Sequence, residues 1–107
     1  MLTQVTLTIG HKVGSSERWD TPTVADAVTT MLGVEAFTAI PCYGMWRGQA
    51  ESSTRIEIVC GNESEARSIA AEVPFLARML EQEAIMCELR PCSTEFVAAS
   101  VAMVTAA

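Results

Sequence analysis

The stretch from Tyr43 to Gly61 reads YGMWRGQAESSTRIEIVCG and predicts a β-hairpin. Its second half, residues 54–60, alternates as a strand does: Ile56, Ile58 and Cys60 on one side, and Arg55, Glu57 and Val59 on the other. Its first strand, residues 36–46, includes Pro41, which cannot donate to a ladder and favours a sheet edge or a bulge. We expect residues 47–53 to form the turn.

The segments around this hairpin predict two more strands and two helices. Residues 4–10, QVTLTIG, and residues 84–90, AIMCELR, alternate between apolar and polar side chains as strands do. Residues 22–32 and 62–80 have apolar side chains at the three- and four-residue spacing of helices. The order is β-α-β-β-α-β, which predicts an α+β fold: a ferredoxin-like βαββαβ sandwich, with antiparallel sheet order 4-1-3-2 and two helices on one face.

Both predicted helices have end signals in the sequence. Asp20 or Thr21 can cap the first helix, and Gly33 ends it in the left-handed conformation. Asn62 followed by Glu65 is a capping-box pattern at the start of the second helix. Pro74 removes a backbone donor within that helix, so we expect a kink or a restart there.

The size and composition of the chain predict one domain. The 107 residues form a single domain, with a core over about residues 3–91 and a tail over residues 92–107. Half of the residues are apolar and the mean hydropathy is +0.27, which favours a subunit interface. The apolar tail reads either as a strand or helix docked on a neighbouring subunit or as a frayed terminus.

The charge and the lack of targeting signals restrict the partners. The net charge is −6, from 13 acidic and 7 basic residues, so binding to a nucleic-acid backbone is not expected. No apolar run reaches the roughly 18 residues of a membrane span, and the start does not resemble a secretory signal. We therefore expect a cytoplasmic protein whose four cysteines are free thiols.

A charged sheet face is predicted opposite the helices. In the predicted order Thr6 and Thr8 lie on the helix-free face between two Arg-Glu pairs, Arg55 with Glu57 and Glu88 with Arg90. This face is either a solvated ladder of ion pairs or part of an oligomer interface. The candidate interface residues are Met45, Trp46, Arg55, Glu57, Glu88 and Arg90.

The run WRGQAESSTRIEIV, residues 46–59, resembles the long hairpin of the CutA family. The shared pattern is Trp46 two residues before Gly48, Glu51 three residues after that glycine, and then an apolar strand. CutA and the PII signalling proteins have ferredoxin-like subunits that form trimers with ligands between subunits. VTLTIGHKVG, GMWRGQAESSTRIEIV and LEQEAIMCEL also resemble uncharacterised small proteins of actinobacteria and their phages.

The resemblance implies a homotrimer that is not an enzyme and that binds a small anionic ligand or a partner protein in a cleft between subunits. The candidate ligand-binding residues are Lys12, Arg47, Arg55, Arg90, Thr6 and Thr8. One alternative is a phage-type modulator that sequesters a nucleotide signal or blocks a host protein. A second is a soft-metal-binding protein, for which Cys42 and Cys60 would have to be cross-strand neighbours.

No catalytic motif is present in the sequence. His11, the one histidine, lies in IGHKVG between two glycines and reads as a solvent loop, with an anion site involving Lys12 and the first helix as an alternative. Glu57 and Glu88 could form a carboxylate pair, but Arg55 and Arg90 are placed to neutralise them. We therefore expect no catalytic residues, no resident metal and no cofactor, and leave an enzymatic role open.

Overall fold

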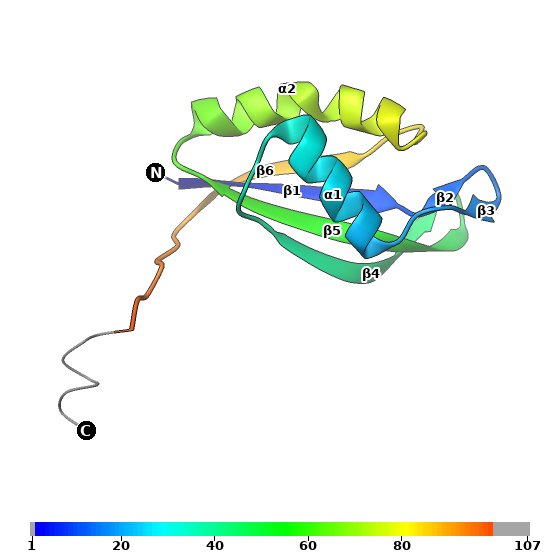
Figure 1. Ribbon diagram of the computed structural model, residues 1–107, viewed down its shortest axis with the longest axis horizontal. Helices are drawn as coiled ribbons and strands as arrows, with labels where there is room; N and C mark the ends of the chain where they lie inside the picture. The colour runs from blue at the N-terminus through cyan, green and yellow to red at the C-terminus, as the bar shows by residue number, and fades with distance from the viewer. Residues whose placement is uncertain (1, 100–107) are drawn as a thin grey trace.

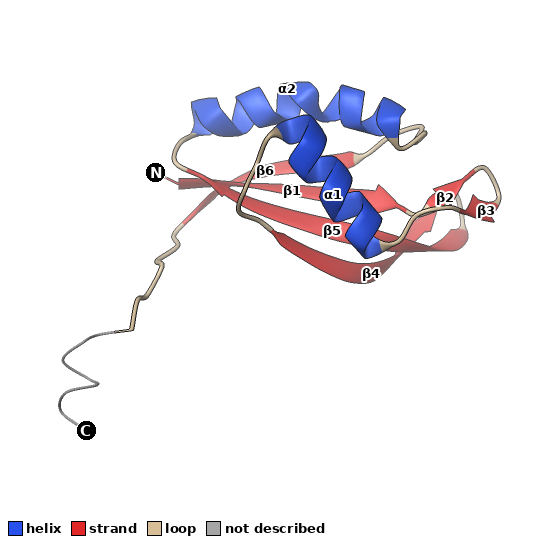
Figure 2. Ribbon diagram, in the orientation of Figure 1, coloured by secondary structure: helices blue, strands red, loops and turns tan. Residues whose placement is uncertain are grey.

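The computed structural model describes residues 2–99 of the chain. It is a mixed α+β fold, with a four-stranded antiparallel sheet, a small two-stranded hairpin and two helices (Figures 1 and 2). In chain order the elements are β1 (Leu2–Gly10), β2 (Lys12–Val13), β3 (Ser16–Glu17), α1 (Thr21–Leu32), β4 (Thr38–Trp46), β5 (Gln49–Cys60), α2 (Glu63–Met79) and β6 (Met86–Cys92). No helix within residues 2–99 is both long enough and apolar enough to cross a membrane.

The four long strands form one sheet in the order β4-β5-β1-β6. All of its neighbours are antiparallel, and β1 lies between β5 and β6. The predicted order 4-1-3-2 numbered four strands, whereas the described residues contain six, so the predicted strand count was wrong. The two additional strands form the short hairpin of β2 and β3, where a plain loop was predicted; Lys12 pairs with Glu17 in it.

Both helices lie over the same face of the sheet (Figure 1). The core fills the space between the helices and the sheet, because the side chains of β1 and β5 that point towards the helices are apolar. Its fully or nearly fully buried members on the strands are Val5, Leu7, Ile9, Ile56, Ile58 and Cys60, and those on and after the helices are Val24, Ala27, Val28, Ala66, Val73, Leu76 and Leu80.

The helix ends are formed as the sequence predicts. Asp20 is the N-cap of α1, and its carboxylate accepts a hydrogen bond of 2.9 Å from the Thr23 amide. Gly33 ends that helix with a φ of 65°, in the left-handed region. Asn62 caps α2 by accepting from the Glu65 amide at 2.8 Å, and the Glu65 carboxylate accepts from the Gly61 amide at 2.9 Å. Both capping predictions are confirmed.

The predictions for the hairpin turn and for Pro74 need correction. The turn of the main hairpin is the pair Arg47 and Gly48, with φ values of 50° and 78°, and not the seven residues predicted. Positive φ at both central residues gives the twist that suits a two-residue hairpin, so β5 begins at Gln49. In α2 the helix runs through Pro74, so the predicted restart is absent, whereas a kink there stays a prediction. Pro74 is exposed to solvent, where water can replace the lost backbone bond.

The C-terminal tail was predicted to be either a strand or helix docked on a neighbouring subunit or a frayed terminus. Residues 93–99 are extended, belong to neither element type, and run away from the domain (Figure 1). The remainder of the predicted tail, residues 100–107, lies outside the described residues.

Candidate functional site

The sheet surface opposite the helices, here called the open face, carries the charged residues predicted for the site. Directly opposed residues of antiparallel strands share a face, so the register fixes its members. Thr6 of β1 lies between Glu57 of β5 and Glu88 of β6. Thr8 lies between Arg55 and Met86, and Arg90 lies opposite Gln4. Arg90 was predicted to lie directly beside the threonines, and this was wrong, because its partner on β1 is Gln4, one cross-strand pair away from Thr6.

The centre of the open face is a buried hydroxyl between two carboxylates. Thr6 is only 4% exposed although it lies on the helix-free side, on the strand between β5 and β6. Its Oγ1 accepts a hydrogen bond of 3.1 Å from Gln4 Nε2. Adjacent strands are about 4.8 Å apart, so the backbones of Glu57 and Glu88 are separated by roughly 10 Å across β1.

Each arginine of the open face already has an acidic partner on its own strand. Arg55 Nε lies 3.4 Å from Glu57 Oε2, and Arg90 Nη2 lies 2.6 Å from Glu88 Oε2. The side chains of both glutamates remain about one-third exposed. Ion pairs this exposed contribute about 0–1 kcal/mol each, so an incoming ligand can displace them at little cost. The open face therefore presents balanced, paired charges rather than a cluster of cations.

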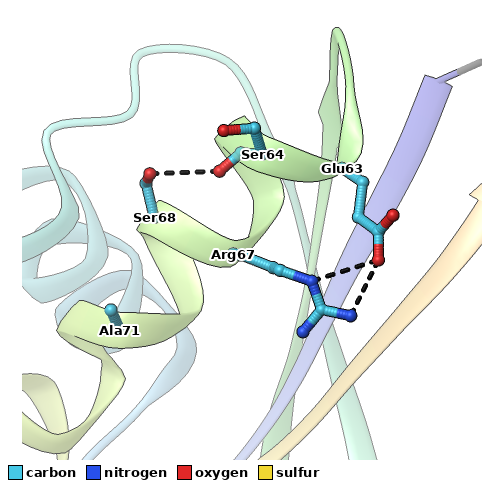
Figure 3. A pocket seen from close by; sticks show the side chains of 5 residues that line it. All are labelled: Glu63, Ser64, Arg67, Ser68 and Ala71. Atoms are coloured by element: carbon cyan, nitrogen blue, oxygen red, sulfur yellow. Dashed lines mark hydrogen bonds and ion pairs between the residues drawn. The ribbon is translucent and has the colours of Figure 1, made fainter.

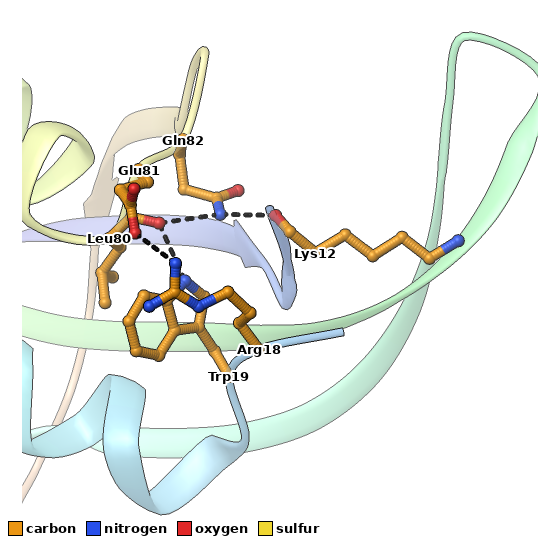
Figure 4. A network of polar contacts seen from close by, with 6 residues as sticks. All are labelled: Lys12, Arg18, Trp19, Leu80, Glu81 and Gln82. Atoms are coloured by element: carbon orange, nitrogen blue, oxygen red, sulfur yellow. Dashed lines mark hydrogen bonds and ion pairs between the residues drawn. The ribbon is translucent and has the colours of Figure 1, made fainter. Parts of the chain in front are cut away.

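The other two predicted ligand-binding residues lie outside the open face. Arg47 is at the turn of the β4-β5 hairpin, 3.5 Å from Glu83 Oε2, with its guanidinium 5.6 Å from the centre of the Trp46 ring. Lys12 is in β2, beyond the end of β1, and its backbone amide donates to Glu51 Oε1 at 3.3 Å. Figure 4 shows its ammonium extending away from the neighbouring side chains. The structure thus brings together Thr6, Thr8, Arg55 and Arg90, but not Lys12 or Arg47.

The predicted anion site beside α1 is not supported. Asp20 occupies the helix N-terminus, and hydrogen bonds from the side chain and then the backbone of Thr23 hold the pKa of Asp20 below its usual value. Pro22 leaves one fewer amide in that first turn. An ionised carboxylate at this position repels a second anion.

The sequence analysis missed a buried polar network around His11. His11 is 7% exposed, and its Nε2 lies 2.6 Å from Thr54 Oγ1. Thr54 is fully buried, and its hydroxyl lies 2.9 Å from Thr21 Oγ1 at the start of α1. The expectation of a solvent loop was wrong. The alternation of β5 could have shown this, since it places Thr54 on the buried side, where a hydroxyl needs a partner.

A second polar network holds the loop before α1 against the end of α2 (Figure 4). Trp19 Nε1 donates to the Leu80 carbonyl at 2.8 Å, and Arg18 Nη1 lies 2.7 Å from Glu81 Oε2. Gln82 Nε2 donates to the carbonyls of Lys12 and Leu80, at 2.9 and 3.1 Å. These contacts fix the position of the β2-β3 hairpin at the end of β1.

A surface hollow at the start of α2 lacks the features of a binding site (Figure 3). It is open to solvent and lined by Glu63, Ser64, Arg67, Ser68 and Ala71. The Arg67 guanidinium is already bound to Glu63 Oε1 by hydrogen bonds of 3.0 and 2.7 Å. A second hollow lies between α1 and the end of α2, beside Trp19 and Met79.

The cysteines do not form a metal site among residues 2–99. All four are free thiols, and no group of three or more His, Cys, Asp or Glu side chains in this part of the chain could hold a metal ion. Cys42 lies opposite Ser53 and Cys60 lies opposite Thr3, so the predicted cross-strand neighbourhood of the two cysteines was wrong. Burial raises the pKa of the Cys60 and Cys87 thiols, which makes them poor ligands and nucleophiles.

Comparison with solved structures gives similar folds at low sequence identity. The chain is similar to a phage SAM lyase in its apo state, with a TM-score of 0.69 and 19% identity over 82% of this chain and 78% of that chain. It is also similar to a phage SAM lyase in complex with S-methyl-5′-thioadenosine, with a TM-score of 0.61 and 18% identity over 83% and 80% of the two chains. A DUF3240 family protein from Shewanella baltica matches with a TM-score of 0.65 and 8% identity over 92% and 97%.

No family model matches the chain, and no curated protein matches it either. The structural matches overturn the main functional prediction, a non-enzymatic module of the CutA/PII kind, because a solved structure of similar fold is a phage lyase. At these identities the matches show a shared fold.

Proposed function

We propose that this protein is a phage-type modulator that binds an adenosyl sulfonium or thioether, the chemical class of S-adenosylmethionine and S-methyl-5′-thioadenosine, and so withdraws a nucleoside signal. The proposal draws on the similarity to phage SAM lyase structures over about four-fifths of each chain. That similarity alone is weak support for function, so the chemistry of the open face has to supply the rest.

The observation that carries the proposal is the alternation of acids and bases around Thr6 on the open face. S-Adenosylmethionine has a positively charged sulfur and an amino acid group with one ammonium and one carboxylate. Glu57 and Glu88 suit the two positive groups, and Arg55 or Arg90 suits the carboxylate. A face with two cations and two anions matches this zwitterionic ligand better than it matches a simple anion.

Thr8 suits the ribose of the ligand, because it lies on the open face opposite Arg55 and its hydroxyl can hydrogen-bond to ribose hydroxyls. Trp46 is too far away to contact the same ligand, because it pairs with Gln49, which is roughly 26 Å along β5 from Glu57. Thr8 is therefore the nucleoside-binding residue in the proposal.

The proposal includes a homotrimer of ferredoxin-like subunits in the cytoplasm. Small-molecule sites usually bury most of their ligand, whereas no helix of the described residues covers the open face of one chain (Figure 1). A neighbouring copy would cover the open face and exclude water, which strengthens the charge pairing with the ligand.

Calorimetric titration with S-adenosylmethionine and with S-methyl-5′-thioadenosine tests the proposal. The thioether lacks both the sulfonium and the amino acid group, so Glu57→Gln and Glu88→Gln should each weaken binding of S-adenosylmethionine about tenfold, by about 1.4 kcal/mol, and affect the thioether much less. Glu63→Gln, on α2 and away from the open face, is the matched control. The proposal fails if neither compound binds, or if the control weakens binding as much as the two test variants.

The same samples decide between sequestration and cleavage. Chromatography of S-adenosylmethionine after incubation with the protein shows the compound unchanged if the protein only binds it. Formation of S-methyl-5′-thioadenosine, absent in a Glu57→Gln sample, would replace sequestration by a lyase activity at the same site.

A further inference from the structure

The chain exposes two apolar groups at opposite ends of its sheet. The first, the hairpin cluster, consists of Tyr43, Met45 and Trp46 near the turn of β4 and β5, with exposures of 80%, 69% and 50%. Tyr43 and Met45 lie on one side of this hairpin and Trp46 on the other, because successive side chains of a strand point to opposite sides. The second lies in the C-terminal arm, residues 93–99, where Phe96 and Val97 are 85% and 87% exposed. Exposed apolar side chains that gather in groups indicate an interaction surface more strongly than scattered ones do.

The C-terminal arm is held at its start by a side-chain hydrogen bond from Thr94 Oγ1 to Cys92 Sγ, at 3.8 Å. It follows β6, whose last residue Cys92 pairs with Leu2 at the start of β1, and it runs away from the domain (Figure 1). No backbone hydrogen bond connects residues 93–99 to the rest of residues 2–99. An extended segment with free backbone groups and a large aromatic is suited to docking on another molecule.

The arm cannot reach the hairpin cluster of its own chain. From Leu2 to Gly10 β1 spans roughly 26 Å, and the hairpin continues for roughly 13 Å more, from Ser53 to Gln49. Val97 is five residues beyond the end of β6, so it can lie at most about 18 Å from that end. The two apolar groups can therefore cover each other only between different copies.

The charges beside the two groups are complementary. Glu95 immediately precedes Phe96 in the arm, and Arg47 immediately follows Trp46 in the hairpin. The Arg47 side chain is 73% exposed, and its ion pair with Glu83 is long, at 3.5 Å. The arm thus carries an aromatic side chain next to an acid, and the hairpin carries an aromatic side chain next to a base.

We propose that the C-terminal arm of one copy packs on the hairpin cluster of a second copy, with Phe96 against Trp46 and Glu95 paired with Arg47. The contact joins two different surfaces, so it is head-to-tail and repeats from copy to copy until a ring closes. It gives the proposed oligomer a specific contact between the two ends of the sheet. It does not depend on any ligand, since it rests on exposure, reach and charge.

The test is the solution mass of two variants, alone and mixed, measured by light scattering without ligand. The arm variant carries Phe96→Ser and Val97→Ser, and the hairpin variant carries Met45→Ser and Trp46→Ser. Wild type should have a multiple of the 11.5 kDa monomer mass, and each variant alone should be a monomer. An equimolar mixture should give twice the monomer mass, because one intact arm then meets one intact hairpin. Phe75→Ser, which removes an exposed phenylalanine from α2, should assemble as wild type does.

Three results would overturn the proposal: a monomeric wild type, a mixture that stays monomeric, or variants that keep the wild-type mass. If circular dichroism shows that a serine variant is unfolded, a charge exchange between Glu95 and Arg47 tests the proposal instead. Glu95→Arg or Arg47→Glu alone should lower the assembled fraction, and the double variant should restore it; no restoration would overturn the proposal. Ligand titrations are separate, so loss of the nucleoside proposal would leave this result unaffected.

Discussion

Replacing Thr54 by valine should destabilise the protein strongly, although the two side chains have nearly the same shape. Thr54 is fully buried, with its Oγ1 2.6 Å from His11 Nε2 and 2.9 Å from Thr21 Oγ1. Valine removes the hydroxyl and so both hydrogen bonds. His11, 7% exposed, would keep a ring nitrogen without a partner, at a cost of about 1–3 kcal/mol. Thr21 is only partly buried, so water can replace its bond and the loss is about 1 kcal/mol.

The expected decrease in the free energy of unfolding is therefore about 2–4 kcal/mol. For a domain of this size it corresponds to a fall in Tm of roughly 8–16 °C. Urea unfolding followed by circular dichroism, with linear extrapolation, measures it directly. The control is Thr38→Val, the same substitution at an exposed position of the edge strand β4, which should stay within about 0.5 kcal/mol of wild type. If Thr54→Val also stayed within that range, the His11 network would contribute nothing to stability and our account of it would be refuted.

Three further predictions concern the caps, the hairpin turn and a thiol. Asn62→Ala should lower the free energy of unfolding by about 1 kcal/mol in urea melts, because the Glu65 amide loses its acceptor, and Ser64→Ala should not. Gly48→Ala should cost about 1–2 kcal/mol in the same assay, since φ is 78° there; a neutral result would contradict the turn geometry. Burial, and to a smaller extent the neighbouring Glu88 charge, raise the pKa of Cys87, so its alkylation midpoint by peptide mapping should lie at higher pH in the native than in the unfolded chain. The stability linked to this thiol should be present below the unfolded pKa and be lost as pH rises above it.

The candidate site was only partly predictable from the sequence. The alternation in TRIEIVC assigned Arg55 and Glu57 to the helix-free face, and the register places them opposite Thr8 and Thr6. The placement of Arg90 opposite Gln4 could not be predicted, because a shift of one pair leaves the alternation unchanged while it moves a charge by two residues along the strand.

The functional class could not be predicted from the sequence either. The hairpin pattern pointed to a CutA-like module, whereas the fold is similar to that of a phage SAM lyase at 19% identity. The residues to which our proposal assigns the choice between a simple anion and a zwitterion are paired within the open face. That pairing, Arg55 with Glu57 and Arg90 with Glu88, depends on side-chain conformations that the pattern of residue types does not determine.

By itself the sequence determined the features that depend on near neighbours: the alternating strands, the apolar helix stripes, and the caps at Asp20, Gly33 and Asn62. These follow from backbone geometry and hydrogen bonds within a few residues. Only the tertiary structure decided the burial of His11, the two-residue turn and the separation of the hairpin cluster from the C-terminal arm. His11 and Thr54 are 43 residues apart in the chain, so only the packing of β5 beside β1 brings them together and removes them from water.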